Sequence, residues 1–289
     1  MLAQFIINGL IMGVNYSLLA IGFAIVYNTT KIFHIAAAGL YVFAAYMFWL
    51  FSVPIGLHSI IAGLVSVILT MSLSLLCEIG VYRPLKHRKA SNNVAMIASI
   101  GLLAIIINSI AMLFGNNAKV IQTVSSESLT IGEILITTPQ LIQVSVGVII
   151  ILLILILLKR SGWGLRLRAL SDDEILFKVL GYNPDATRTV IFLMSGAIIA
   201  ISSDLTAYDL GLDPQMGMNF LVSAIVAMII GGIGKTWTCL IGGLTLGVLQ
   251  ALVSGYFSAS WQNAVSFILL LLFLFLKPSG IAGIKTRTV

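Results

Sequence analysis

Few residues in this 289-residue chain have the types and spacing that chemistry requires. Gly234-Lys235-Thr236 resembles the end of a phosphate-binding loop, but Ile229 stands where that loop needs a glycine. The histidines and cysteines lack metal-site spacing, and no Gly-x-Ser-x-Gly or His-Glu-x-x-His motif occurs; the residues concerned are His34, His58, His87, Cys77 and Cys239. We therefore expect no catalytic, cofactor-binding or metal site in this chain, and expect Lys235 to anchor a membrane surface.

Asp204 is the acidic residue that most needs an explanation, because it lies within the apolar stretch 197–210. A carboxylate in a membrane span is costly and usually faces a cavity or a partner. Two interpretations stay open: a role with substrate or ions, or a solvated or hydrogen-bonded structural role. Together with Asp204 we take the following residues as candidates for a translocation path: His34, Asn108, Asp209, Asp213, Asn219, Gly231, Gly232 and Gly234.

The composition predicts the class of protein that must position these residues. The chain is 59% hydrophobic and 9% charged, whereas a soluble chain carries roughly a quarter charged residues. Its apolar runs are continuous and approach the ~20 residues that cross a bilayer as a helix. A membrane barrel would instead alternate apolar and polar residues. The sequence therefore predicts an all-α, polytopic helical membrane protein.

Nine apolar segments divide the chain, at about 4–27, 36–52, 57–82, 94–115, 140–158, 189–208, 218–234, 238–255 and 261–277. The seventh and eighth meet at Gly231-Gly232-Ile233-Gly234, where either could be re-entrant, so eight or nine segments are expected. The first segment lacks a basic start and a cleavage site, which favours a retained span. We treat residues 1–289 as one transmembrane domain.

Basic residues predict the orientation of these segments. With the N-terminus outside and the C-terminus inside, every Lys and Arg except Lys119 lies inside or at an inner helix end. This bias explains the net charge of +6 without a nucleic-acid partner. Loop 116–139 is then an external surface loop, and loop 159–188 is the main polar segment inside.

A short helix with its own capping signals is predicted within loop 159–188. Ser171 is a suitable N-cap, Glu174 can complete a capping box, and Gly181 can end the helix. The predicted helix, Asp172–Leu180, carries an apolar stripe formed by Ile175, Leu176, Val179 and Leu180. Nine residues are too few to hold a helix alone in water. The stripe must therefore lie against the membrane, the rest of the chain or a partner.

The sequence of this loop, Gly164–Asp173 followed by Val179–Tyr182, resembles the cytoplasmic coupling loop of ABC importer permeases of the branched-chain amino-acid type, the LivH class. The resemblance covers nearly the whole chain in the family's order. Its other motifs are Arg83–Ser91, Ile97–Leu102, Asp213-Pro214, Gly217, Ile230–Gly234, Gly242-Gly243 and Lys277–Gly280.

The resemblance implies partners and a place in the cell. Such permeases work in the bacterial inner membrane with a second homologous permease, two cytoplasmic ATPase subunits and a periplasmic or lipid-anchored binding protein. ATP and magnesium are used by the ATPases, so this chain is not expected to be an enzyme. Residues 168–181 would dock on an ATPase; the coupling residues are Arg168, Ser171, Asp172, Asp173, Glu174, Leu176, Val179 and Gly181.

Departures from the family pattern leave the substrate open. Members commonly carry Asn-Phe-Ala-His-Gly-Glu where this chain has His34–Gly39, and they often carry small residues where it has Asp204. Branched-chain or other amino acids are expected from the resemblance, with urea and short amides as alternatives. A stand-alone secondary transporter or channel using Asp204 is the rival hypothesis, and a non-transporting membrane scaffold is a third.

Overall fold

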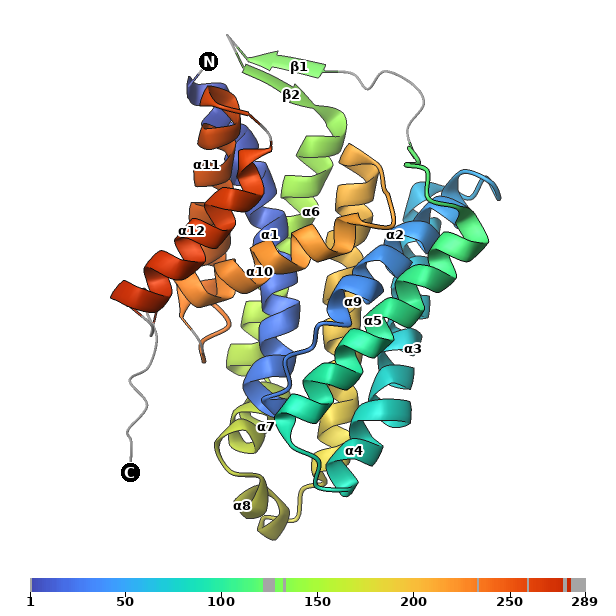
Figure 1. Cartoon of the computed structure of the whole chain (residues 1–289), viewed down its shortest axis with the longest axis vertical. Coiled ribbons are helices and arrows are strands. Elements are labelled where there is room, and N and C mark those ends of the chain that lie inside the picture. The colour runs from blue at the N-terminus through green and yellow to red at the C-terminus, as the bar shows by residue number, and fades with distance from the viewer. Residues whose placement is uncertain are drawn as a thin grey trace.

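Long apolar helices form the body of the computed structural model, which describes residues 2–121, 128–131, 134–232, 234–258, 260–277 and 280–281 (Figure 1). Nine of its helices coincide with the predicted apolar segments: α1 Leu2–Thr30, α2 Ala37–Ser52, α3 Ser59–Cys77, α5 Asn92–Phe114, α6 Thr138–Arg160, α9 Pro184–Leu210, α10 Met216–Gly231, α11 Thr238–Tyr256 and α12 Trp261–Leu276. The helical membrane class is confirmed. Six helices, one of them continuing from α3 to His87, are long and apolar enough to span a membrane, while α2, α10 and α12 are shorter. The number of complete crossings stays a prediction.

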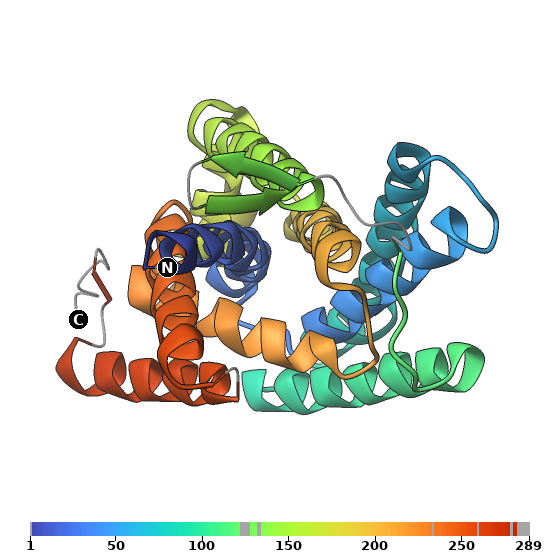
Figure 2. The ribbon, with the colours of Figure 1, turned by 90° about the horizontal axis from the view of Figure 1, so that it is seen from above.

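Helix α1 is the central element of the bundle. It packs against α6, α9, α10 and α11, and Figure 2 shows it enclosed by these helices when the bundle is seen from above. Small residues allow its closest contact: a Cβ on Gly13 would lie 2.8 Å from the Cα of Leu244 in α11. Close backbone approach at glycine is a common way for membrane helices to associate, because lipid provides no hydrophobic driving force between helices.

Helix α3 does not end at the membrane surface but continues through a π-helical turn. This turn, η1 (Glu78–Tyr82), leads directly into α4 (Arg83–His87), which has a proline in its first turn. Single π turns within α-helices are uncommon and are frequent at functional sites. The turn places Glu78 and Tyr82, both fully buried, against the neighbouring helices.

The predicted surface loop 116–139 contains a short hairpin. Strands β1 (Ser128–Ile131) and β2 (Ile134–Thr137) pair antiparallel near the N-terminal end of α1, where Leu135 N donates a hydrogen bond of 2.9 Å to Gln4 Oε1. Pairing between two chain segments depends on their approach in space, so the polar composition alone did not indicate it.

The junction between α10 and α11 is a break at glycines. Gly232 and Gly234 have φ angles of +110° and +105°, which side-chain-bearing residues rarely adopt, while Ile233 lies outside the described residues. Figure 1 shows α10 running obliquely across α1 and α9. The geometry explains why the helix must end at Gly231. Whether α10 is re-entrant stays a prediction.

The polar segment between α6 and α9 forms two helices where the sequence predicted one. Helix α7 covers Gly162–Asp172 and α8 covers Glu174–Val179. The prediction of a helix over Asp172–Leu180 capped by Ser171 is therefore wrong in its start and its cap. Ser171 lies inside α7, and its hydroxyl donates to the backbone oxygen of Asn28 at 2.7 Å.

Candidate functional site

Helix α8 lies at one extreme end of the bundle, beyond the ends of α1, α3 and α9 (Figure 1). The residue that begins it is Asp173, whose extended backbone separates α8 from α7. Its carboxylate accepts hydrogen bonds from the backbone amides of Ile175 and Leu176 at 2.7 and 3.1 Å. Aspartate caps a helix as well as serine does, and the hydroxyl of Ser171 is already engaged elsewhere. Gly181, with φ +84°, follows the end of α8, as predicted.

The apolar stripe of α8 is uncovered. Its four residues have exposed fractions of 55–78%: Ile175, Leu176, Val179 and Leu180. Phe177, in contrast, is 1% exposed and stacks on Tyr182, with ring centroids 5.2 Å apart. The helix therefore uses one aromatic residue to attach to its own chain and leaves the stripe free. Of the three surfaces considered for the stripe, the part of the chain that the structure describes is not the one that covers it.

Ion pairs fix α8 to the ends of two long helices. Glu174 was predicted to complete the capping box, but its carboxylate instead lies 2.6 Å from Lys86 Nζ in α4 and 3.8 Å from Lys178 Nζ. Lys86 also lies 3.3 Å from Asp185 in the first turn of α9. A single ammonium group thus joins α8, α4 and α9.

A buried ion pair lies behind this contact. Arg188 of α9 donates to both oxygens of Glu78 in the π turn, at 2.9 and 3.3 Å, and both residues are at most 5% exposed. The sequence analysis missed this pair. The available signal was a charged residue, Glu78, inside the apolar segment 57–82, since a charge in a span needs a partner.

The other predicted coupling residues lie on the same segment. The guanidinium of Arg168 donates to the backbone oxygen of Leu158 at 2.9 Å, and Asp172 is exposed at the end of α7. The structure thus brings the predicted coupling residues together at one end of the bundle. Their role in coupling stays a prediction.

The candidate path residues are not gathered in one place. His34 lies in the connection between α1 and α2, where it contacts Tyr82 of the π turn, whereas Asp209 lies in the last turn of α9 and Asp213 shortly after that helix ends. Asn108 and Asn219 are exposed on α5 and α10, where a partner or a path can reach them. Gly231, Gly232 and Gly234 form the α10–α11 break described above. Their assignment to a path stays a prediction.

Asp204 is nearly buried and has a local partner. The hydroxyl of Ser66 lies 2.9 Å from its Oδ1 atom, and its exposed fraction is 8%. It also lines a groove of about 550 Å³ between α2, α3, α6 and α9, together with His58 and Tyr208. The structure thus contains both features that the sequence left open, a structural hydrogen bond and access to a cavity.

His34 belongs to a buried polar chain that links the start of α2 to the π turn η1 and to α5. Its Nδ1 atom lies 2.8 Å from the hydroxyl of Tyr82, which donates to Ser99 at 2.9 Å. Ser99 in turn accepts from the backbone amide of Ala36 at 2.8 Å. These contacts orient His34. Within the described ranges, no group of three or more His, Cys, Asp or Glu residues could hold a metal ion.

The fold and the site together define a polytopic helical membrane protein whose polar end carries a short helix with an exposed apolar stripe. Across residues 5–274 the chain matches the family described as "Branched-chain amino acid transport system / permease component", and it belongs to this family. The family is one of transport permease components and not of enzymes, and the resemblance proposed from the sequence is confirmed.

Two curated relatives match nearly their full length. The high-affinity branched-chain amino acid transport system permease proteins BraD of Pseudomonas aeruginosa PAO1 and LivH of Escherichia coli K12 are each 28% identical, over 97% of this chain and 95% of theirs. A tyrosine transport system permease protein of Clostridioides difficile is 28% identical over 74% of this chain and 68% of its own. The solved structure of PsaBC from Streptococcus pneumoniae in complex with Fab has a TM-score of 0.55 and 18% identity, covering 96% of this chain and 97% of that one, and supports the fold.

Proposed function

We propose that the chain is a permease subunit of an ATP-driven importer for amino acids, branched-chain or related small polar solutes. The observation that carries this proposal is α8, an exposed apolar helix fixed by ion pairs to the ends of membrane-spanning helices. Such a helix provides both a docking surface and a mechanical connection. A second permease, two cytoplasmic ATPases and a binding protein complete the proposed importer.

In the proposed mechanism, the ATPases displace α8 as they close and open. Lys86 transmits the displacement to α4 and α9 through Glu174 and Asp185. Because α4 continues through the π turn into α3, movement of α4 tilts the end of α3, and the Glu78–Arg188 pair moves α9 with it. The spans then alternate between outward-open and inward-open arrangements, which is alternating access. ATP and magnesium stay with the partners.

The proposed orientation places α8 and the C-terminus in the cytoplasm and the N-terminus outside, in a bacterial inner membrane. Basic residues at the α8 end include Lys31, Arg88, Lys89, Lys159 and Arg160, which is the bias of cytoplasmic loops. For the substrate, the relatives named above are described for branched-chain amino acids and for tyrosine. A neutral side chain on an amino-acid substrate is their shared feature.

Co-purification tests the proposal. Tagged protein is extracted from native membranes in mild detergent, and ATPase activity is measured on what accompanies it. We expect ATP-hydrolysing subunits to accompany the native protein and to be lost when Leu176 and Val179 are both changed to Asp. Ile55→Asp is the matched control, since Ile55 is 53% exposed in the α2–α3 loop at the other end. A folded protein that is purified without any accompanying ATPase subunit would contradict the proposal.

A stand-alone secondary transporter is the second candidate, and the position of Asp204 favours it. A buried carboxyl group that lines a groove can exchange a proton or bind a cation. This candidate requires gradient-driven uptake by the purified chain alone in vesicles. Uptake that appears only when ATPase subunits and ATP are added would exclude it.

A further inference from the structure

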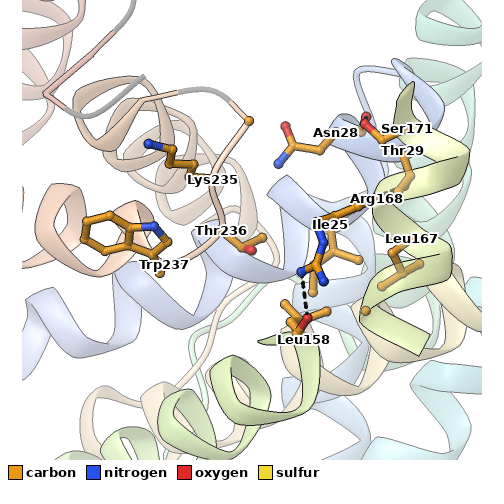
Figure 3. Close-up of a pocket in the computed structure, with 12 residues that line it drawn as sticks. Ile25, Asn28, Thr29, Leu158, Leu167, Arg168, Ser171, Lys235, Thr236 and Trp237 are labelled. Carbon is orange, nitrogen blue, oxygen red and sulfur yellow. Dashed lines mark hydrogen bonds between the residues drawn. The ribbon is translucent and has the colours of Figure 1, made fainter. Parts of the chain in front are cut away.

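A pocket of about 190 Å³ opens between the C-terminal end of α1, helix α7 and the connection from α10 to α11 (Figure 3). It brings together segments far apart in sequence, with Asn28 from α1, Arg168 and Ser171 from α7, and Lys235 and Thr236 from the connection. Figure 3 shows the guanidinium of Arg168 lying between Thr236 on one side and Leu167 on the other. The coupling segment and the glycine break thus share one cavity.

The polar lining of this pocket is cationic. Arg168 and Lys235 both line it, and none of the lining residues is an Asp or Glu. Among the described residues, neither cation takes part in an ion pair. The guanidinium group uses one N–H group on the backbone oxygen of Leu158 and keeps others available. Two cations with hydroxyl and amide groups around them form a site suited to a phosphate-type anion.

The apolar lining indicates where that anion comes from. Ile25, Leu158 and Leu167 are each at most 9% exposed and form the inner side of the pocket. Ile25 and Leu158 lie near the ends of the spans α1 and α6, so the pocket lies at the membrane surface. Trp237 is 49% exposed at its rim, a position that tryptophan favours at lipid headgroups. A charged site with an apolar side, open at the level of the headgroups, is suited to an amphiphile.

We propose that this pocket binds the phosphate of an anionic phospholipid headgroup and thereby links the α10–α11 connection to α7. Basic pockets between membrane helices on the cytoplasmic side bind such headgroups. Only the choice of the cytoplasmic leaflet rests on the proposed orientation. Figure 3 shows the Lys235 side chain directed away from Arg168, so in this proposal Lys235 turns toward the bound phosphate, which then bridges the two cations. The anionic lipid content of the membrane thereby affects how firmly α7 is held.

The test uses the purified chain in neutral detergent, with retained lipid counted by native mass spectrometry. We expect phosphatidylglycerol to be retained and phosphatidylcholine not, and inorganic phosphate to compete only weakly. Lys235→Gln and Arg168→Gln are expected to weaken retention about fivefold each, the effect of one basic residue near an anionic surface. Lys89→Gln, an exposed cation outside the pocket, is the matched control and is expected to change nothing.

Several outcomes would overturn the proposal. Equal retention of phosphatidylglycerol by Lys235→Gln and Lys89→Gln would show that the pocket is not the site. Inorganic phosphate binding as tightly as the lipid would assign the site to a free anion. Lys235→Arg keeps the charge and is expected to bind normally, so equal loss in Lys235→Arg and Lys235→Gln would exclude charge recognition. Unchanged lipid retention by Lys235→Gln, together with loss of the ATPase from this variant in the separate co-purification experiment, would assign the pocket to protein docking. Lipid binding is measured without ATPases, so its failure leaves the proposed function standing.

Discussion

Removing one partner of the Glu78–Arg188 pair is expected to destabilise the protein strongly. Arg188→Met would leave the carboxylate of Glu78, which is 0% exposed, buried without a counter-charge. Breaking such a pair typically costs about 3–5 kcal/mol. For a protein of this size each kcal/mol lowers the melting temperature by about 2–3 °C, so we expect a decrease of about 6–15 °C.

A thiol-reactive fluorophore can follow this unfolding, because Cys77 and Cys239 are both buried in the folded chain. All variants carry Cys77→Ser, so that Cys239 is the cysteine that reports unfolding. Cys239 lies on α11, far in sequence from Arg188. Lys89→Met is the matched control, since removal of an exposed cation typically changes stability by less than about 0.5 kcal/mol.

The double variant Glu78→Gln with Arg188→Met separates pairing from packing. The double variant leaves no buried charge without a partner. We therefore expect its melting temperature to be well above that of Arg188→Met alone, so the effects of the two substitutions on stability are not additive. A melting temperature of Arg188→Met within about 2 °C of the native protein, which corresponds to less than about 1 kcal/mol, would refute the reasoning. So would additive effects of the two changes.

Three further predictions follow from the packing and the proposed coupling. Gly13→Leu is expected to prevent close packing of α1 on α11 and to abolish stable folding. At Gly101 an added Cβ meets no atom within 4 Å, so Gly101→Leu should keep the native melting temperature. Equal melting temperatures of the two variants would contradict the proposed close packing at Gly13. Lys86→Glu places a like charge beside Glu174 and Asp185, so reconstituted importer should lose solute uptake per ATP hydrolysed while ATPase subunits still co-purify; unchanged uptake would exclude the proposed transmission. Asp204→Asn keeps a hydrogen-bond acceptor for the hydroxyl of Ser66, so ATP-driven uptake into vesicles should be preserved. Loss of this uptake in Asp204→Asn would instead support an ion-binding role for Asp204.

Local composition was sufficient for the membrane class and for the positions of the nine apolar helices. Hydropathy is summed over about 20 neighbouring residues, and each span satisfies its backbone internally, so no distant contact is needed to predict it. Gly181 was likewise predictable as a stop, because glycine adopts positive φ without a partner. The family followed from motifs in order along the chain.

The tertiary structure alone decided how the polar residues are used. Ser171 and Asp173 are both acceptable caps, and the nearby backbone of Asn28 engages Ser171 and leaves the cap to Asp173. Glu78 and Arg188 are 110 residues apart, and only the packing of α9 against the π turn makes them partners. The same packing leaves the stripe of α8 exposed. Buried charges and surface stripes are defined by what lies next to them in space, and neighbours along the chain do not determine this.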